Sequence, residues 1–258
     1  PRPIIEPPLY LGALMCLIIV AIGEHPEFPL IIAANRDEFF ERPARQAEFW
    51  NDAPHILAGK DLRRGGTWLG VTRTERFAAL TNFRDLSRPI ANGPSRGVLV
   101  RNALDADIDP TSSEQYDGFN LIYGPMDALR YHNNIDGSDL LLSSGIHGLS
   151  NHLLDTPWPK VVSAKIAVAA AMDGSTDLLV DRLFSVLGSA ERASDSDLPK
   201  TGVPLEWERS LSSIFIATNG YGTRCSTVLL VDLHGTVTFE ERTHSPVALP
   251  AVKFSFKV

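Results

Sequence analysis

The sequence predicts an α+β protein in which mostly antiparallel β-sheets are covered by helices. Apolar runs of strand length occupy both ends of the chain, whereas the strongest helical patterns lie in its middle. Many neighbouring runs are separated by turn residues over hairpin-length connections, which favours antiparallel pairing. No stretch has the composition of a linker, so we expect residues 15–258 to form a single domain.

The first two strands are predicted to form a hairpin. Cys16–Ile22 contains a β-branched run, IIV, which is typical of a buried strand. Residues 30–35 form the second strand, and the intervening GEHPEFP contains the Gly and Pro residues of a turn. The apolar stretch 9–22 is shorter than the roughly 20 residues that a membrane-spanning helix needs. We therefore expect no stable insertion into a membrane.

Helical spacing of apolar residues occurs at three later places. Residues 95–106 show it with Ser95 in the N-cap position. Thr156 and Pro157 open the strongest helix, which extends to Met172, because Thr is a capping residue and Pro is favoured in the first turn. Residues 177–187 form a further helix.

The remaining segments are predicted as strands or loops. A polar segment, 39–64, is punctuated by Pro43 and Pro54 and is assigned no helix or strand, whereas 145–151 is predicted as loop and 188–210 as a polar linker. The predicted strands are 67–72, 77–81, 119–123, 128–132, 140–143, 214–218, 227–232, 236–241 and 252–256.

Composition restricts the class of partner and the compartment. The chain has 31 acidic and 24 basic side chains, a net charge of −7, which disfavours nucleic acid as a partner. The two cysteines, Cys16 and Cys225, are too few for a disulfide scaffold and indicate a reducing, cytoplasmic location. Residues 1–14 are rich in Pro and precede Met15. We interpret them as an upstream extension outside the mature fold.

Several kinds of site are missing from the sequence. It contains no glycine-rich phosphate loop and no G-x-S-x-G nucleophile motif. The seven histidines lack the close spacing of metal ligands. We therefore expect neither a metal nor a cofactor.

The remaining candidates are polar residues at predicted strand ends, where a sheet can present them to one cleft. Each has a simpler interpretation: a cysteine in a strand is usually packing, an asparagine after a strand is usually in a turn, and an arginine can merely pair with an acid. The candidates are Cys16, Arg36, Asp37, Asn82, Asn151 and Arg224.

Together these residue types supply the parts of a nucleophilic site. If translation starts at Met15 and that residue is removed, Cys16 gains a free α-amine, whose pKa near 7.7–8.0 suits a base beside its own thiol. Arg36 and Arg224 would favour the thiolate, and Asp37 could hold the ammonium. Asparagine and backbone N–H donors could stabilise an oxyanion.

Six sequence blocks resemble the NRDE family, also called the transport and Golgi organisation family. They are AANRDEFFERPA (33–44), GGTWLGV (65–71), AALTNF (78–83), GFNLIY (118–123), GLSNHLLDTPWPK (148–160) and GYGTRCSTVLLVD (220–232). The resemblance runs from Met15 to about Glu241. It implies the four-layer αββα sandwich of N-terminal-nucleophile hydrolases and a more distant similarity to bile-salt and penicillin V hydrolases.

The same resemblance assigns roles to the candidates. In those hydrolases an N-terminal Cys is followed by an Arg and an Asp, two Asn residues and a late Arg, which the six candidates match in order. One departure is that the hydrolases separate Arg and Asp by two residues, whereas Arg36 and Asp37 are adjacent.

The resemblance leaves three functions open. The first is a cysteine amidohydrolase or acyltransferase that acts on a small acylated substrate with Cys16 as nucleophile. The second is a haem- or lipid-handling trafficking factor without hydrolase activity, although no Cys-Pro motif is present to ligate haem. The third is an inert scaffold that kept the fold and lost the chemistry.

Overall fold

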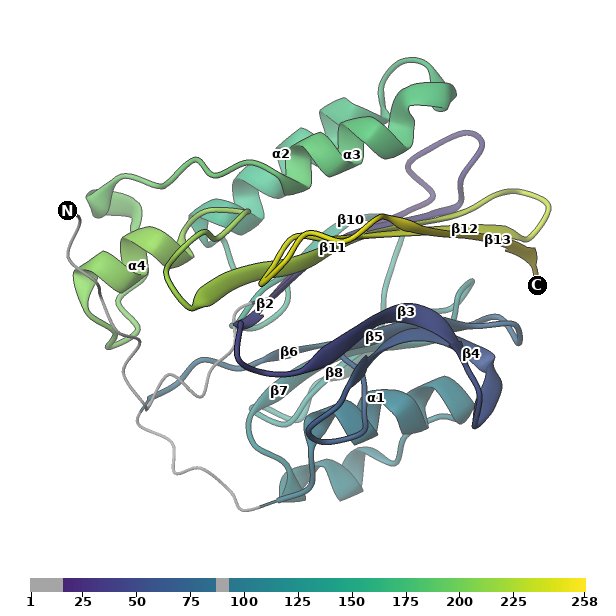
Figure 1. The fold of residues 1–258 in the computed structure, drawn as a ribbon, viewed down its shortest axis with the longest axis horizontal. Coiled ribbons are helices and arrows are strands. Elements are labelled where there is room, and N and C mark those ends of the chain that lie inside the picture. The colour runs from purple at the N-terminus through teal and green to yellow at the C-terminus, as the bar shows by residue number, and fades with distance from the viewer. Residues whose placement is uncertain (1–15, 87–92) are drawn as a thin grey trace.

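The computed structural model describes residues 16–86 and 93–258, with the side chains of residues 110 and 111 left aside. The predicted extension, residues 1–14, lies outside the described residues. In the described part of the chain, two antiparallel sheets pack face to face, and helices cover the outer face of each (Figure 1). This arrangement confirms the predicted four-layer αββα sandwich.

The upper sheet contains the N-terminal hairpin and the C-terminal strands. Its strand order is β10-β1-β2-β11-β12-β13, and every neighbouring pair is antiparallel. The strands are β1 (Cys16–Ile22), β2 (Leu30–Phe39), β10 (Gly145–Leu149), β11 (Tyr221–Val231), β12 (Thr236–Thr243) and β13 (Val252–Lys257). β1 and β2 are therefore internal, which fits their continuous apolar sequences.

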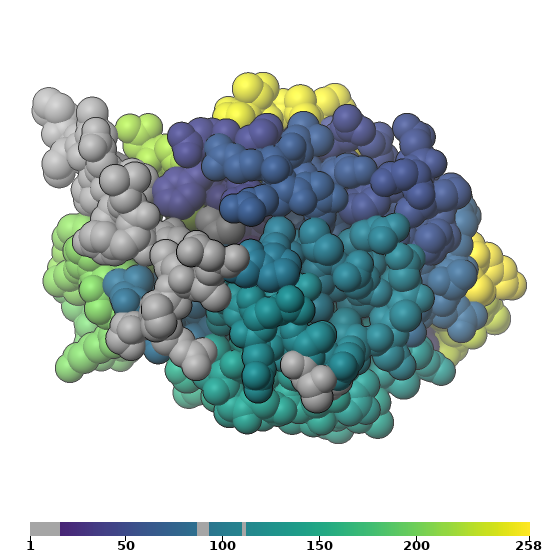
Figure 2. Space-filling view, turned by 90° about the horizontal axis from the view of Figure 1, so that it is seen from below, coloured from purple at the N-terminus to yellow at the C-terminus, as the bar shows by residue number. Residues whose placement is uncertain are grey.

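The lower sheet is a meander of consecutive strands, β3 to β9 in order. Its strands are β3 (Ala44–Trp50), β4 (Ala53–Asp61), β5 (Leu69–Thr72), β6 (Arg76–Asn82), β7 (Phe119–Pro125), β8 (Arg130–Asn133) and β9 (Asp139–Leu141). Figure 2 shows the molecule from below, where this blue-to-teal segment forms most of the face and the yellow C-terminal strands reach only its edges.

The helices form the two outer layers. The upper layer contains α2 (Pro159–Met172), α3 (Leu179–Leu187) and α4 (Leu205–Leu211), whereas α1 (Arg96–Asp105) lies beneath the lower sheet (Figure 1). Short 3-10 turns accompany them at Pro110–Gln115, Thr176–Leu178 and Asp195–Asp197.

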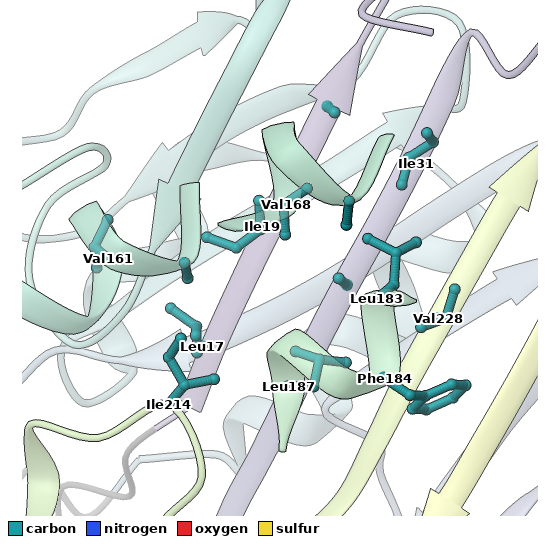
Figure 3. Packing of buried hydrophobic residues seen from close by; sticks show 14 of the residues in the cluster. Leu17, Ile19, Ile31, Val161, Val168, Leu183, Phe184, Leu187, Ile214 and Val228 are labelled. Carbon is teal, nitrogen blue, oxygen red and sulfur yellow. The ribbon is translucent and has the colours of Figure 1, made fainter. Parts of the chain in front are cut away.

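Each contact between layers has its own apolar core. Figure 3 shows side chains of α2 and α3 packed onto β1, β2 and β11, among them Val168, Leu183 and Ile19. A second core, which includes Ile18 and Ile32, fills the space between the sheets, and a third joins α1 to the lower sheet. Burying each large apolar side chain contributes about 1.5–3 kcal/mol, so the three cores dominate the stability of the layers.

The element predictions were right in type for most of the chain and incomplete or wrong in four places. The segment 39–64, to which no element was assigned, contains the hairpin β3–β4, and the predicted loop 145–151 contains β10. Helix α4 lies within the predicted linker 188–210, and the predicted strand 214–218 forms a single bridge between Ala217 and Gly222. The strands β3, β4 and β10 show no regular alternation of polar and apolar residues, and their structure comes from pairing with neighbouring strands.

Candidate functional site

Cys16 is the first residue of β1, and its side chain faces the space between the sheets. Along β1, Leu17 and Ile19 belong to the core beneath the helices, whereas Ile18 and Val20 belong to the core between the sheets. Since side chains alternate along a strand, Cys16 points the same way as Ile18. The sulfur therefore lies at the edge of the inter-sheet space.

The same alternation divides the Asn35-Arg36-Asp37-Glu38 run between two faces. This run forms the end of β2, as predicted, although the strand extends beyond the predicted limit at residue 35. The Asn35 amide donates to the carbonyls of Leu187 and Ile214 on the helix side, at 2.8 and 2.9 Å. Arg36 is paired with Cys16 in register, and its guanidinium lies 3.7 Å from the Glu38 carboxylate on the inter-sheet side.

A cleft of about 400 Å³ opens between the two sheets beside Cys16. Its wall combines the ends of β1 and β2 with residues of the lower sheet and the first turn of α1. Charged and amide side chains predominate near the thiol. The polar lining residues are Cys16, Arg36, Asp37, Glu38, Arg42, Lys60, Asp61, Arg64, Thr67, Asn82, Ser95, Arg96 and Asp117.

The Cys16 thiol is protonated in this environment. Burial raises its pKa to about 12, and the charge on Asp37 acts in the same direction. A hydrogen bond with the Asp37 backbone and the charge on Arg36 act in the opposite direction but are outweighed. A nucleophilic Cys16 therefore requires a base close to the sulfur.

The two asparagines lie together behind the thiol. Asn82 lines the cleft, and its carbonyl accepts a 2.7 Å hydrogen bond from the Asn151 amide, which is fully buried. The neighbouring Ser150 hydroxyl donates to the Cys16 carbonyl at 3.0 Å. The β10 end thus fixes both the start of β1 and the end of β6.

Arg224 is directed away from the thiol. It occupies a β-bulge in β11, where the register against β2 shifts between Thr223 and Cys225. Its guanidinium donates to the carbonyls of Phe39, Phe40 and Arg42 at 3.0, 3.1 and 2.7 Å. The residue lines a second cavity of about 410 Å³, which also includes Arg36, rather than the cleft beside Cys16.

The sequence analysis missed four basic residues of the cleft, of which Arg42 and Arg96 have the clearest contacts. Arg42 forms a 2.6 Å ion pair with Asp61 and lies 3.4 Å from Glu38. Arg96, in the first turn of α1, donates to the Gly118 carbonyl at 2.9 Å and lies within range of the charge on Cys16. Burial lowers the pKa of Arg96. Neither residue stands at a strand end, so the signal used for the other candidates could not find them.

A buried acid and a buried base lie on the helix side of β2. Burial raises the pKa of Asp37 to about 7, against the effects of Lys160 and of a 2.6 Å hydrogen bond from the Thr223 hydroxyl. Burial lowers the pKa of Lys160 to about 8, against the effect of Asp37. The sequence analysis missed Lys160, because a lysine in the first turn of an amphipathic helix normally extends into solvent.

Other kinds of site find no support within residues 16–86 and 93–258. No group of His, Cys, Asp and Glu side chains in these ranges is arranged to hold a metal ion. None of the helices described has the length and apolar character needed to cross a membrane. Cys16 and Cys225 are both free thiols.

Solved structures that resemble this chain include an acid amidase and a bile acid hydrolase. The Caenorhabditis elegans ortholog of N-acylethanolamine-hydrolyzing acid amidase matches 83% of this chain and 92% of its own, with a TM-score of 0.44 and 14% identity. A variant of the conjugated bile acid hydrolase of Clostridium perfringens matches 94% of this chain and 97% of its own, with a TM-score of 0.48 and 9% identity.

Several proteins share a higher sequence identity with this chain than these solved structures do. The Transport and Golgi organization protein 2 homologs of Bos taurus and Homo sapiens are 36% and 35% identical to this chain, over 89% of it and 93% of their own length. The Transport and Golgi organization protein 2 of Drosophila melanogaster is 28% identical over 89% of this chain and 92% of its own. The family model for Transport and Golgi organisation 2 matches residues 15–246. The chain belongs to the Transport and Golgi organisation 2 family.

Proposed function

We propose that the chain is a cysteine hydrolase or acyltransferase of the N-terminal-nucleophile type, acting on the amide bond of a small acylated substrate. The observation that carries the proposal is the position of Cys16. It begins a central strand, and its thiol lies in the wall of a cleft of about 400 Å³ lined by Arg36 and Asn82. The proposal requires a chain in which Cys16 is the first residue, and we propose a cytoplasmic location for it.

The proposed reaction begins with a proton transfer within Cys16. The α-amine takes the proton from the sulfur, and the thiolate attacks the acyl carbonyl of the substrate. Donors at Asn82 stabilise the oxyanion that forms, an interaction typically worth about 3–4 kcal/mol. Asn151 acts on Asn82 through its hydrogen bond to the Asn82 carbonyl.

The second half of the reaction releases the products. The C–N bond breaks as the α-ammonium gives its proton to the leaving amine, which leaves a thioester on Cys16. Water then attacks the thioester, losing a proton to the α-amine, and the thiol is restored by that proton as the acid leaves. An acceptor amine in place of water would give acyl transfer.

The second cavity favours an alternative function, the handling of haem or lipid without hydrolysis. Its volume is about 410 Å³, and apolar side chains form much of its wall: Phe40, Pro43, Trp68, Pro246, Val247 and Leu249. Cys225 lies at this cavity and is the candidate haem ligand there, but burial raises the pKa of its thiol, which opposes thiolate ligation.

The test compares the 258-residue chain, a chain that begins at Cys16, and the shorter chain with Cys16→Ser or Cys16→Ala. Each is incubated with N-acyl amides and thioesters of varied chain length, and the thioester intermediate is sought by intact mass spectrometry. We expect turnover and a covalent acyl adduct from the shorter chain with Cys16 alone. Turnover that survives Cys16→Ala would overturn the proposal, and binding of haem or acyl chains without turnover would favour the alternative.

A further inference from the structure

Lys160 is a lysine whose ammonium group is almost completely removed from water. It is the second residue of α2, its exposed fraction is 2%, and it ranks among the largest fully buried side chains. Its Nζ atom has no hydrogen-bond partner among the described residues. Burying a charged group costs several kcal/mol, so an unpaired buried ammonium needs a compensating interaction.

Asp37 lies close to this lysine and is incompletely paired as well. Thr223 donates to its Oδ1 atom at 2.6 Å, whereas Oδ2 is buried without a partner among the described residues. The two opposite charges act on each other, yet no ion pair within 4.0 Å joins them in the described part of the chain. A donor on one side and an acceptor on the other thus face a common buried region.

The start of β1 adjoins that same region. Cys16 is paired with Arg36, the neighbour of Asp37, and the Asp37 backbone is hydrogen-bonded to the Cys16 thiol. The charge on Cys16 also acts on Lys160. In a chain that begins at Cys16, the α-amine is attached to the Cα atom that bears the thiol side chain, and the electrostatic effects of Cys16 therefore reach Asp37 and Lys160 from the residue that carries the amine.

Resting on the function proposed above, we infer that Lys160 and Asp37 form a buried receptor for the α-amine of Cys16, in which Asp37 holds the amine and Lys160 keeps it unprotonated. Lys160 is thus a positioning residue for the reaction. An ammonium beside the amine disfavours a second positive charge, and low-dielectric surroundings strengthen that effect. Asp37 Oδ2 accepts a hydrogen bond from the neutral amine and keeps its lone pair directed at the sulfur.

The shifts of the two groups agree with this arrangement. Burial lowers the pKa of Lys160 to about 8 and raises that of Asp37 to about 7, so the pair gains or loses protons easily near neutral pH. The charged or titratable groups around Lys160 come from four places in the fold: Cys16, Asp37, Arg84 and Glu208. Of these, Arg84 is engaged with Glu208 at 3.3 Å and stacks over Trp158.

The experiment measures the protonation of the α-amine directly, without reference to activity. A chain that begins at Cys16 is labelled with ¹³C-cysteine and carries Cys225→Ala, so that one cysteine remains. The ¹³Cα shift of Cys16 is then followed against pH in this chain and in its Lys160→Met, Lys160→Gln and Lys160→Arg variants.

We expect the titration midpoint of the amine to rise by about one to two pH units in Lys160→Met and in Lys160→Gln. It should stay near its original value in Lys160→Arg, which keeps the charge. The matched control is Lys165→Met, on the same helix, because Lys165 is half-exposed and pairs with Asp155 at 2.6 Å. That variant should leave the midpoint unchanged.

The result separates this inference from the proposed function. An unchanged midpoint in folded Lys160→Met or Lys160→Gln overturns the inference, even if turnover depends on Cys16. A raised midpoint with no turnover in any form supports the inference and counts against the proposed hydrolase.

Discussion

At the scale of single residues, the Arg224 guanidinium holds the backbone that follows β2. It donates to three carbonyl groups there, those of Phe39, Phe40 and Arg42. Hydrogen bonds from a charged donor contribute about 1.5–3 kcal/mol each. Arg224 therefore stabilises the backbone that forms part of the cleft wall, and it does not contact the Cys16 sulfur.

We therefore expect Arg224→Met to lower the free energy of unfolding by about 2–4 kcal/mol, with Arg224→Lys recovering part of the loss. Urea unfolding measures the change. Arg130→Met is the control, since Arg130 pairs with Asp139 on the surface, where such pairs contribute little. Full stability of Arg224→Met together with lost turnover would instead place Arg224 in the chemistry.

The protonation of Asp37 leads to a second prediction at this scale. Its pKa is about 7 in the folded protein against 3.8 for the free side chain, because burial penalises the carboxylate. Between these values the folded form binds a proton that the unfolded form has lost, so stability falls as pH rises from about 4 to about 7. Lys160, lowered to about 8, gives the opposite slope above pH 8.

Replacing Asp37 by Asn should flatten the lower part of this profile. The Asn side-chain oxygen still accepts from Thr223, but the group no longer titrates. Free energies of unfolding from urea titrations at a series of pH values provide the measurement, with exposed Asp177→Asn as the control. An identical pH slope in Asp37→Asn and the unmodified chain would contradict the assignment.

How far the site could be predicted depends on which residue is considered. Cys16, Arg36 and Asn82 follow from polar residues in apolar surroundings at strand ends, and the structure brings them to one cleft. Arg224 fits the same pattern, but it lies in a β-bulge and its side chain lines the second cavity. No feature of the sequence predicts this bulge. Lys160 could not be predicted, since its burial results from tertiary packing beside α4, which the local sequence does not reveal.

At the scale of elements, the first turn of α1 lies against the backbone before β5. Thr67 donates to the Gly97 carbonyl at 3.1 Å, and a Cβ atom on Gly66 would lie 2.2 Å from the Gly97 carbonyl carbon. This contact has no room for a side chain. It determines where Arg96 enters the cleft.

We expect Gly66→Ala to lower the free energy of unfolding by about 1–3 kcal/mol or more, because α1 must move to admit the methyl group. The same variant should lower turnover, since Arg96 moves with the helix. Gly188→Ala is the matched control: its φ of −84° suits any residue, and its nearest neighbour would be 3.4 Å away. Equal stability of the two variants would show that the contact is not tight.

Among the elements, local patterns predicted those that bury a continuous apolar face. The limits of β1 were predicted exactly as observed, and α2 begins at Pro159, two residues after the expected Pro157. The β3–β4 hairpin was missed because its strands alternate polar and apolar residues irregularly and contain bulges. Such strands are defined by their partners, which a local reading of the sequence does not reveal.

At the scale of the whole molecule, the core between the sheets couples the two halves of the sandwich. Trp207 belongs to the core under the upper helices and Trp50 to the core over α1. Ile32, which is fully buried, belongs to the core between them. The layers share these contacts, so we expect one cooperative unfolding transition.

Two single-tryptophan variants test this coupling, one retaining Trp50 and the other Trp207, with Phe at the remaining tryptophans. Their fluorescence midpoints in urea should coincide, and Ile32→Ala should lower both together by an amount that corresponds to about 2–5 kcal/mol. Midpoints that differ, or a change at one tryptophan alone, would show that the layers unfold separately.

More of the overall architecture than of the candidate site could be predicted from the sequence. Strand-length apolar runs at both ends of the chain and helices between them were enough to predict antiparallel sheets covered by helices. The four layers followed from the family resemblance, and the structure confirms them. The pairing of β10 beside β1, which brings Asn151 to Asn82, depends on residues more than a hundred positions apart and has no local signal.

The alternation of side chains along Asn35-Arg36-Asp37-Glu38 has a consequence for inherited variation. The neighbouring residues Asn35 and Arg36 face opposite sides of one strand, so substitutions at the two positions should affect different properties of the protein. Substitutions at Asn35, whose amide ties β2 to Leu187 and Ile214, should reduce the amount of protein that accumulates. Substitutions at Arg36, which lies at the cleft, should leave abundance high and yield an inert product. A survey of variants that scored only growth would not distinguish Asn35 variants from Arg36 variants. A survey that also scored protein abundance would separate them, because only the Asn35 variants should be depleted.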